Sequence, residues 1–203
     1  MTEKRDQKKA DLKTRLVDAA ENRIAAQGLA ALRAREVTSD AGCALGALYT
    51  AFADIDLLVL HVNSRTLARL GSALEIAAAS ATDPGLKLAA LAQGYLAFAR
   101  DNPHLWAALF DHHMPDSAQV PDWHLAEHAV LIAHIVAPLA ALAPGLDEAA
   151  LHLRARTLFA AVHGIVKVSL EGRFVGARED ALPGELAAFI ALLTAGMAAA
   201  RGA

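Results

Sequence analysis

The chain has 203 residues, enough for one large core or for a small module joined to a larger one. Hydrophobic residues make up 55% of the sequence and aromatic residues only 5%, with Ala and Leu dominant, which favours packed helices over a β-sandwich. The formal net charge is −3, yet residues 1–35 hold nine Lys and Arg against five Asp and Glu, so only the N-terminal end is suited to a polyanionic partner.

Composition also restricts the compartment. No apolar run approaches the stretch of about 20 residues that a bilayer span needs, and no apolar signal region follows the charged N-terminus. The single cysteine, Cys43, excludes an internal disulfide framework and fits a reducing compartment. We therefore expect a soluble, cytoplasmic protein with no membrane partner.

The first third of the chain predicts four helices. An amphipathic helix over residues 8–27 stops at Gly28. Two short helices over residues 33–41 and 45–52 follow, and a tight turn containing Gly42 separates them, which is the pattern of a helix-turn-helix. After them Asp54 can cap a long helix that covers residues 55–80 and links two units.

Beyond the turn at residues 82–85, proline, glycine and asparagine mark the borders of further helices. These helices are predicted over residues 86–100, 103–113, 121–141, 147–171 and 183–201. Pro138 lies inside one of these patterns and predicts a kink or an end there. The sequence thus predicts an all-α fold.

The helix-turn-helix segment carries a recognisable order of residues. Val37 is followed by Ala41 and Gly42 at the turn, and Gly46, Leu48-Tyr49 and Phe52 come after it. Over about residues 12–60 this order resembles the TetR family of transcriptional regulators. The resemblance implies a helix-turn-helix DNA-binding domain over residues 1–55, a ligand-binding and dimerisation domain over residues 56–203, no cofactor and no enzymatic activity.

In this arrangement the second short helix is free to lie in the major groove of double-stranded DNA. The hydroxyls of Tyr49 and Thr50 suit phosphates, Ala47 can touch a thymine methyl, and Gly46 lets the backbone approach closely. The lysines at the N-terminus are expected to form a flexible basic arm. The predicted DNA-binding residues are Lys4, Lys8, Lys9, Arg33, Arg35, Leu45, Gly46, Ala47, Tyr49 and Thr50.

Three positions depart from the family pattern. Ala44 stands where a Ser or similar cap is usual, Leu45 stands where polar or basic residues are frequent, and Ile55 replaces a common Lys that touches phosphate. A second hypothesis therefore stays open, in which the DNA-binding head is weakened and the chain acts as a ligand-binding or protein-interaction module.

The C-terminal half resembles the WHG-type TetR ligand-binding domain more loosely, through residues 102–106 and 162–166. That resemblance implies a cavity for a small, partly apolar effector and a homodimer that represses at a palindromic operator. The predicted cavity residues are Tyr95, Phe98, Trp106, Phe110, His128, Ile132, Phe159 and His163. The predicted dimer residues are Leu158, Val162, Leu186, Phe189, Ile190, Leu193 and Met197, although a core within one chain would use the same residues.

Eight of the nine histidines lie from His104 to His163 and raise a metal alternative. His124 to His128 match the H-x-x-E-H pattern of zinc peptidases, but no sheet-forming sequence or third ligand accompanies them. A structural metal held among His112, His113, His124 and His128 is the other metal hypothesis, and solvated histidines are the favoured alternative to both.

Overall fold

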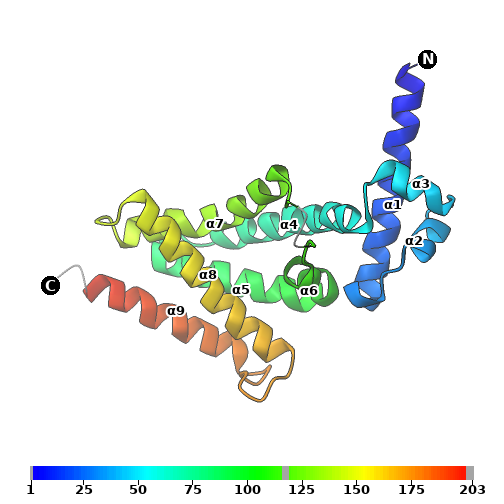
Figure 1. Cartoon of the computed structure of the whole chain (residues 1–203). Coiled ribbons are helices and arrows are strands. Elements are labelled where there is room, and N and C mark those ends of the chain that lie inside the picture. The colour runs from blue at the N-terminus through cyan, green and yellow to red at the C-terminus, as the bar shows by residue number, and fades with distance from the viewer. Residues whose placement is uncertain (1, 116–118, 200–203) are drawn as a thin grey trace. The chain divides into compact units, whose positions relative to one another are not determined.

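The computed structural model describes residues 2–115 and 119–199, and within them every regular element is a helix. This confirms the predicted all-α fold. The helices are α1 (Thr2–Gln27), the 3₁₀ turn η1 (Leu29–Ala31), α2 (Ala34–Asp40), α3 (Leu45–Ala51), α4 (Ile55–Ala79), α5 (Pro84–Asp101), α6 (Pro103–Asp111), α7 (Asp122–Leu142), α8 (Glu148–Leu170) and α9 (Leu182–Ala199). Figure 1 labels the α-helices.

The described chain divides into two compact units that interleave in sequence. The first unit joins the residues up to Ala68 to Asn102–Leu125, and the second joins Arg69–Asp101 to the chain from Ala126 onward. The sequence placed a border at residue 55, which lies inside the first unit. Helix α6 belongs to the first unit because Leu105 and Ala108 are buried in that unit's core.

In the first unit, α1, α2 and α3 pack on one another (Figure 1). From α1, Leu16, Ala20 and Ile24 enter the core, spaced by four residues on one helix face. Burial of Leu16 and Ile24 contributes about 1.5–3 kcal/mol each to folding. The four residues that the sequence predicted to face this core are indeed buried: Val37, Ala41, Leu48 and Phe52.

The turn between α2 and α3 depends on Gly42, whose φ of 62° lies in the left-handed region that L side chains adopt at a cost. The Gly42 N–H donates to the Ser39 carbonyl at 3.1 Å, and the Cys43 N–H donates to the Thr38 carbonyl at 2.9 Å. From α1, Nη1 of Arg15 donates to the Ala41 carbonyl at 2.7 Å. These bonds end α2 and set the direction in which α3 leaves the turn.

Two arginines tie α1 to its neighbours. Arg23 pairs with Asp40 at 2.5 Å and with Glu36 at 2.6 Å, both on α2. The hydrogen bond from Arg23 lowers the pKa of the Asp40 carboxyl below its usual value. From α4, Arg65 pairs with Asp18 at 2.6 Å and with Glu21 at 3.0 Å. Two carboxylates of α1 and two of α2 are therefore paired with arginines within the unit.

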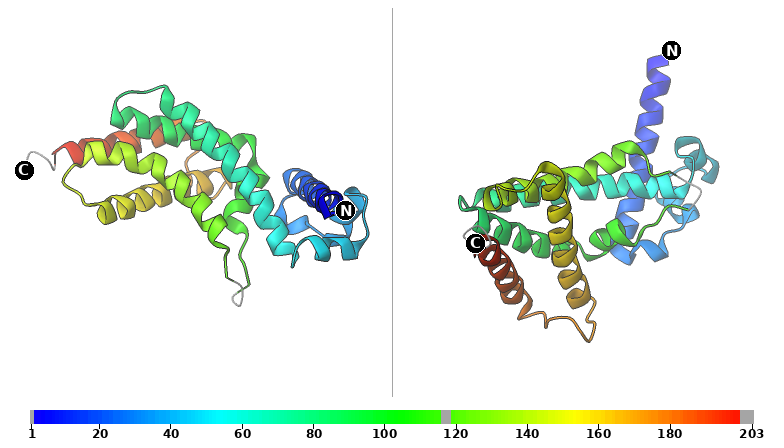
Figure 2. Two further views of the ribbon diagram at one scale, coloured as in Figure 1. Left: turned by 90° about the horizontal axis from the view of Figure 1, so that it is seen from above. Right: turned by 60° about the vertical axis from the view of Figure 1, so that its left-hand side comes forward.

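The second unit is built on α5 and α9, which run side by side (Figures 1 and 2). Gln93 of α5 donates to the Pro183 carbonyl at 2.8 Å and fixes the start of α9. Gly94 permits close approach of α4, since a Cβ at that position would lie 2.9 Å from the Cβ of Ala77. The sequence predicted a kink or an end of the helix at Pro138. The helix does not end there, because Pro138 lies inside α7.

Helix α7 corrects one expectation from composition. By length and composition it could cross a membrane, and only 17% of its most apolar window is buried within the chain. This property of α7 is hard to recognise in the sequence, because Glu127, His128, His134 and Pro138 interrupt the apolar run. The mean hydropathy of the helix nevertheless stays high. Among the described residues it is the single unbroken helix of this kind, and α3 with α4 pass the same test only as a pair bent by 68°.

Candidate functional site

Helix α3 has one buried and one exposed face. Leu48 and Ala51 are buried in the first unit's core. The other face exposes Tyr49 by 53% and Leu45 by 37%, together with Gly46 and Thr50, while Ala47 is half-buried. The structure therefore brings the five residues of α3 predicted to read DNA onto one short helix whose outer surface is free of the chain's own packing.

Backbone access is greatest at Gly46. A Cβ built at this position meets no atom within 4 Å, so the fold itself does not require glycine there. The Thr50 hydroxyl donates to the Gly46 carbonyl at 3.0 Å and keeps its oxygen lone pairs available as acceptors. The helix thus presents bare backbone beside two hydroxyl-bearing side chains.

Basic side chains flank this surface. Arg33 and Arg35 are exposed before and within α2, and Arg33 donates to the carbonyls of Ala30 and Leu32 at 2.8 and 2.9 Å. The ammonium of Lys13 lies 5.3 Å from the centre of the Phe52 ring, next to the end of α3.

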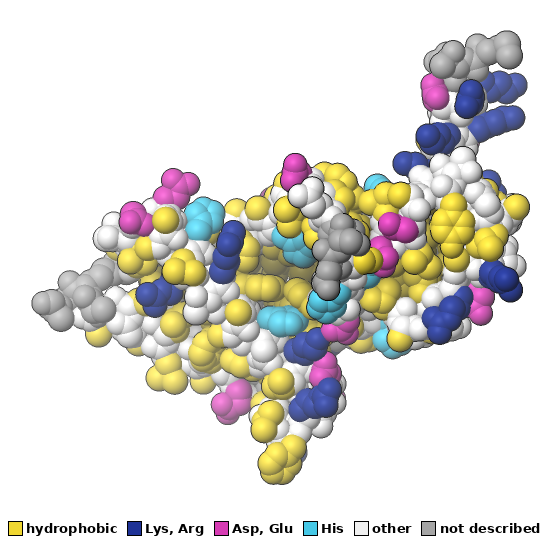
Figure 3. All heavy atoms as spheres, viewed as in Figure 1, with side chains coloured by type: hydrophobic (Ala, Val, Ile, Leu, Met, Phe, Trp, Pro, Cys, Tyr) yellow, Lys and Arg dark blue, Asp and Glu magenta, His cyan; other side chains and the backbone are white. Residues whose placement is uncertain are grey.

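Lys4, Lys8 and Lys9 are also exposed, but the prediction of a flexible arm is wrong for them. They belong to α1, which begins at Thr2 rather than near residue 8. The repeated Lys, Arg, Gln and Ala residues of this stretch have high helix propensity, and the helix continues through them. Figure 3 shows dark-blue cationic side chains gathered along this end of α1.

The acidic residues near α4 are engaged. Asp54 accepts from the Leu57 N–H at 2.7 Å, which confirms its predicted role as a helix cap. Asp56 accepts from Nε2 of His112 at 3.0 Å, and the imidazole is nearly buried. Both carboxylates thus have partners in the unit, which lessens their repulsion of a polyanion.

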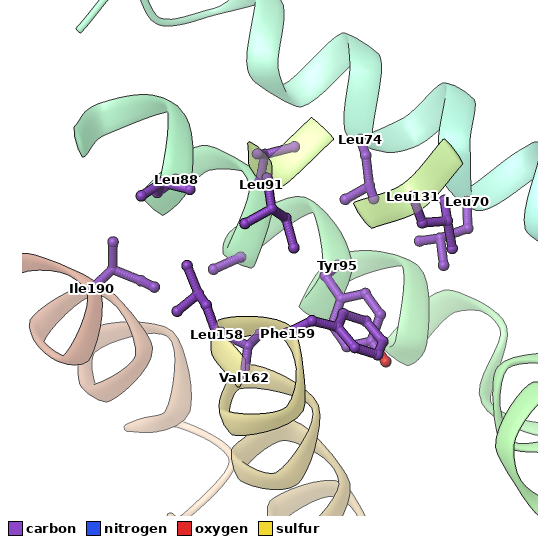
Figure 4. Close-up of a pocket in the computed structure, with 12 residues that line it drawn as sticks. Leu70, Leu74, Leu88, Leu91, Tyr95, Leu131, Leu158, Phe159, Val162 and Ile190 are labelled. Atoms are coloured by element: carbon purple, nitrogen blue, oxygen red, sulfur yellow. The ribbon is translucent and has the colours of Figure 1, made fainter. Parts of the chain in front are cut away.

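The second unit contains a small cavity of about 40 Å³ that is partly open to solvent. Side chains from α4, α5, α7, α8 and α9 converge on it (Figure 4). Its wall consists of Leu70, Leu74, Leu88, Leu91, Ala92, Tyr95, Leu131, Ile135, Leu158, Phe159, Val162 and Ile190. Hydrocarbon dominates this lining, so the cavity suits an apolar ligand.

The polar groups at the cavity come from one pair. The hydroxyl of Tyr95 and Nδ1 of His163 are hydrogen-bonded at 2.8 Å. Phe159 packs against both, with ring centroids 5.7 Å from Tyr95 and 5.9 Å from His163. In Figure 4 the rings of Tyr95 and Phe159 lie side by side. Tyr95 is thus the one lining residue with a polar group on its side chain, and His163, which lies outside the lining, engages that hydroxyl.

The structure places the residues predicted for the ligand cavity in different surroundings. Tyr95 and Phe159 line the cavity and His163 supports them, but Phe98 is buried elsewhere in the second unit. Trp106 and Phe110 belong to the first unit, because α6 packs on α1 and not around the cavity.

Helix α7 presents a different face from the one predicted. Leu131 and Ile135 line the cavity, whereas His128 and Ile132 do not. The residues predicted for the cavity were mostly aromatic residues and histidines, and they included none of the leucines that line it. The signal that could have found them is the repetition of Leu70 with Leu74, and of Leu88 with Leu91, at helical spacing.

The residues predicted for a dimer interface divide into two groups. Leu158, Val162, Leu186 and Ile190 are buried within the second unit, so the alternative of a core within one chain holds for these four. Phe189, Leu193 and Met197 remain half-buried. The most exposed apolar side chains on the last two helices are Leu153 and Leu192, at 68% and 75%.

The histidine-rich region shows no metal-binding geometry in the part of the chain that the structure describes. No three His, Cys, Asp or Glu side chains there come together in a way that could hold an ion. His124 is buried beside the Trp123 ring, which also stacks on His61 at 5.0 Å. These contacts give His124 a packing role and lend no support to the metal hypotheses.

Comparison with known families supplies the assignment. Residues 88–195 match the family described as "Tetracyclin repressor-like, C-terminal domain", which is more than half of the chain. This protein belongs to the TetR family of transcriptional regulators. It is thus a regulator and not an enzyme, and regulators of this family bind DNA operators and small-molecule ligands and act as dimers.

Solved structures share the fold of this TetR-family chain. A protein of unknown function from Rhodococcus sp. RHA1 is 25% identical, with a TM-score of 0.72 over 92% of this chain and 95% of that one. RolR in complex with resorcinol is 19% identical, with a TM-score of 0.68 over 95% of each chain.

A TetR transcriptional regulator from Rhodococcus sp. RHA1 is 20% identical, with a TM-score of 0.63 over 92% of this chain and 97% of that one. Among curated proteins none matches the sequence. The fold is therefore shared along nearly the whole length, including the helix-turn-helix that precedes the matched domain.

Proposed function

We propose that this regulator is a homodimeric repressor that holds a palindromic double-stranded operator through α3 and releases it when a small, apolar effector enters the cavity. The observation that carries the proposal is the outer face of α3, which the first unit presents without covering. The residues on that face are Leu45, Gly46, Ala47, Tyr49 and Thr50.

The contacts divide by chemistry. Tyr49 and Thr50 hydroxyls bind phosphate oxygens and fix the register of α3, as such contacts do in other helix-turn-helix proteins. Arg33, Arg35 and the lysines of α1 neutralise phosphates and supply the salt-dependent part of the affinity. A regulator that binds genomic DNA acts in the cytoplasm. The proposed function therefore does not require α7 to cross a membrane.

The effector is proposed to be small and mainly hydrocarbon, with at most one or two polar atoms directed at Tyr95 and His163. The lining supports this, because a charged group buried against leucine side chains would lose its hydration without compensation. RolR, which shares this fold, is described in complex with resorcinol, a small aromatic compound with two hydroxyls.

Coupling between the two activities is proposed to run through α4. This one helix contributes Leu58 and Val62 to the first unit's core and Leu70 and Leu74 to the cavity wall. An effector that prefers one position of Leu70 and Leu74 shifts the population of α4 toward it. The effector therefore depletes the arrangement that binds DNA. The depletion is greater when the effector binds the other arrangement of α4 more tightly.

The dimer is proposed to form through the outer faces of α8 and α9. Leu153 and Leu192 are exposed, and Phe189, Leu193 and Met197 are incompletely covered. A two-fold axis places the same apolar patch on both partners, which is what a palindromic site requires. Leu158, Val162, Leu186 and Ile190 support this surface from inside and do not touch the partner.

The test is fluorescence anisotropy with a labelled duplex from the region upstream of the protein's own gene, over a series of salt concentrations. The expected result is binding that weakens steeply with salt, with a smaller salt slope for Arg35→Ala. Leu153→Glu is the matched control for dimerisation and should lower affinity together with molecular mass. Failure to bind at any salt concentration would favour the weakened-head hypothesis.

Release is tested with N-phenyl-1-naphthylamine, a neutral apolar fluorophore, as the cavity probe. Its fluorescence should rise with the wild-type protein, and Val162→Trp, which fills the cavity, should abolish the rise. The probe should lower DNA affinity in the wild type and leave it unchanged in the filled variant. A probe effect of equal size in both proteins would refute a role for this cavity.

A further inference from the structure

The exposed face of α3 lacks the side chains that usually distinguish bases. Along Leu45–Ala51 there is no Lys, Arg, His, Asn, Gln, Asp or Glu. The two polar groups are the hydroxyls of Tyr49 and Thr50, and the Thr50 hydroxyl is directed at the Gly46 carbonyl. This helix therefore has no bidentate donor for guanine and no amide for adenine.

What α3 does expose is hydrocarbon. Leu45 is 37% exposed at the first position of the helix, whereas Leu48, three residues later, turns toward the core and is fully buried. Ala44 is exposed beside Leu45, and Ala47 is half-buried. The space over Gly46 is open, so an approaching surface can reach the backbone next to Leu45.

Charge identifies the surface that approaches. The cation of Lys13 lies over Phe52 at the end of α3, and Arg33 and Arg35 are exposed in the same unit, so cationic side chains accompany the apolar face. A duplex offers the matching arrangement, with phosphates on both sides of a groove. Within the major groove, the thymine C5 methyl is the apolar group among the base edges.

We propose that α3 recognises its operator by contact with thymine methyl groups, with Leu45 and Ala47 as the specificity-determining residues. The inference rests on the proposed DNA-binding function and adds the chemistry of the bases that are read. Cations bind the phosphates of any sequence, and methyl contacts select among sequences. The preferred half-site therefore contains thymine at the position that faces Leu45.

The test compares two duplexes of the same upstream sequence, one with thymine and one in which uracil replaces every thymine. Uracil keeps the pairing and the O4 acceptor and lacks only the methyl group. Removing one buried methyl lowers affinity about fourfold, so two symmetric half-sites give a thymine-to-uracil ratio of roughly fifteenfold or more. The salt slope should be the same on both duplexes, because the phosphates are unchanged.

Two variants separate methyl reading from altered duplex flexibility. Leu45→Ala should lower the ratio to the part that Ala47 supplies, and Leu45→Met, which keeps an apolar side chain of similar size, should preserve it. Arg35→Ala is the matched control and should weaken both duplexes equally. In each variant, circular dichroism should show the helix content of the wild type.

The outcomes are distinct. Equal affinity for thymine and uracil duplexes, or a ratio that Leu45→Ala leaves unchanged, would overturn methyl recognition and leave the DNA-binding function standing. Absence of binding to the thymine duplex at low salt would overturn both. As a further arm, replacing the contacted thymine by cytosine should weaken binding, and 5-methylcytosine at the same place should restore part of the loss.

Discussion

Leu48 offers the sharpest test of how the helix-turn-helix is held together. Its side chain is fully buried in the first unit, in a core that also contains Leu16, Ile24 and Val37. Truncation to alanine removes three carbons from a site that rigid helices surround, so the cavity left behind closes only in part. The expected loss is about 2–5 kcal/mol of unfolding free energy for this unit.

The assay is native-state hydrogen exchange of the amides in α2 and α3, because it measures the opening free energy of the first unit even if the second unit remains folded. Leu45→Ala is the matched control, since it makes the same chemical change on the exposed face of the same helix. It should change the opening free energy by no more than about 0.5 kcal/mol. Equal losses for the two variants would refute the assignment of the buried and exposed faces of α3.

Three further changes test other parts of the structure. Gly42→Ala should cost about 1–2 kcal/mol in urea unfolding, because φ is 62° there, and an unchanged midpoint would contradict the turn. Gly176→Ala should cost about 1–3 kcal/mol, since its Cβ would lie 2.6 Å from the Val168 carbonyl, while Gly184→Ala, with open space around it, should not destabilise. Asp40→Asn should destabilise at neutral pH. Because folding lowers the Asp40 pKa, the wild-type advantage exists above the ordinary pKa of about 3.9 and should vanish as the pH falls below it; a constant difference down to pH 2 would exclude the Arg23 pairing as its source.

The helix-turn-helix was predictable because its determinants are local. Helical spacing on α1, a glycine at the turn and Asp54 as a cap each act within a few residues, and the structure has all three. The prediction of a flexible arm was wrong because it considered charge alone. Helix propensity is also a local property, and that of Lys4, Lys8 and Lys9 extends α1 to Thr2.

Membership of α6 in the first unit was beyond a sequence reading. It depends on contacts between residues about 80 positions apart, such as the bond from Nδ1 of His104 to the Ala25 carbonyl at 2.9 Å. Nothing in the local pattern of residues 103–113 distinguishes a helix that packs on α1 from one that borders the cavity. Trp106 and Phe110 were therefore assigned to a ligand site that they do not reach.

The cavity was predictable in kind and only partly in detail. An apolar interior follows from composition, but periodicity alone does not say which of two apolar faces of α7, α8 or α9 points inward. Leu158 and Val162 fit a dimer surface and a cavity wall equally well by spacing, and the packing of α8 on α5 and α9 decides for the wall. The prediction selected large aromatic side chains, whereas leucines form about half of the lining.

The most direct test of the account is hydroxyl-radical footprinting of the purified protein on the duplex upstream of its own gene. The account requires protected backbone segments related by a two-fold axis, with half-sites one helical turn of about 10 base pairs, or a multiple of it, apart. A mass of two chains for each protected symmetric site should accompany them. Uniform cleavage at every protein concentration would contradict the claim that α3 reads an operator.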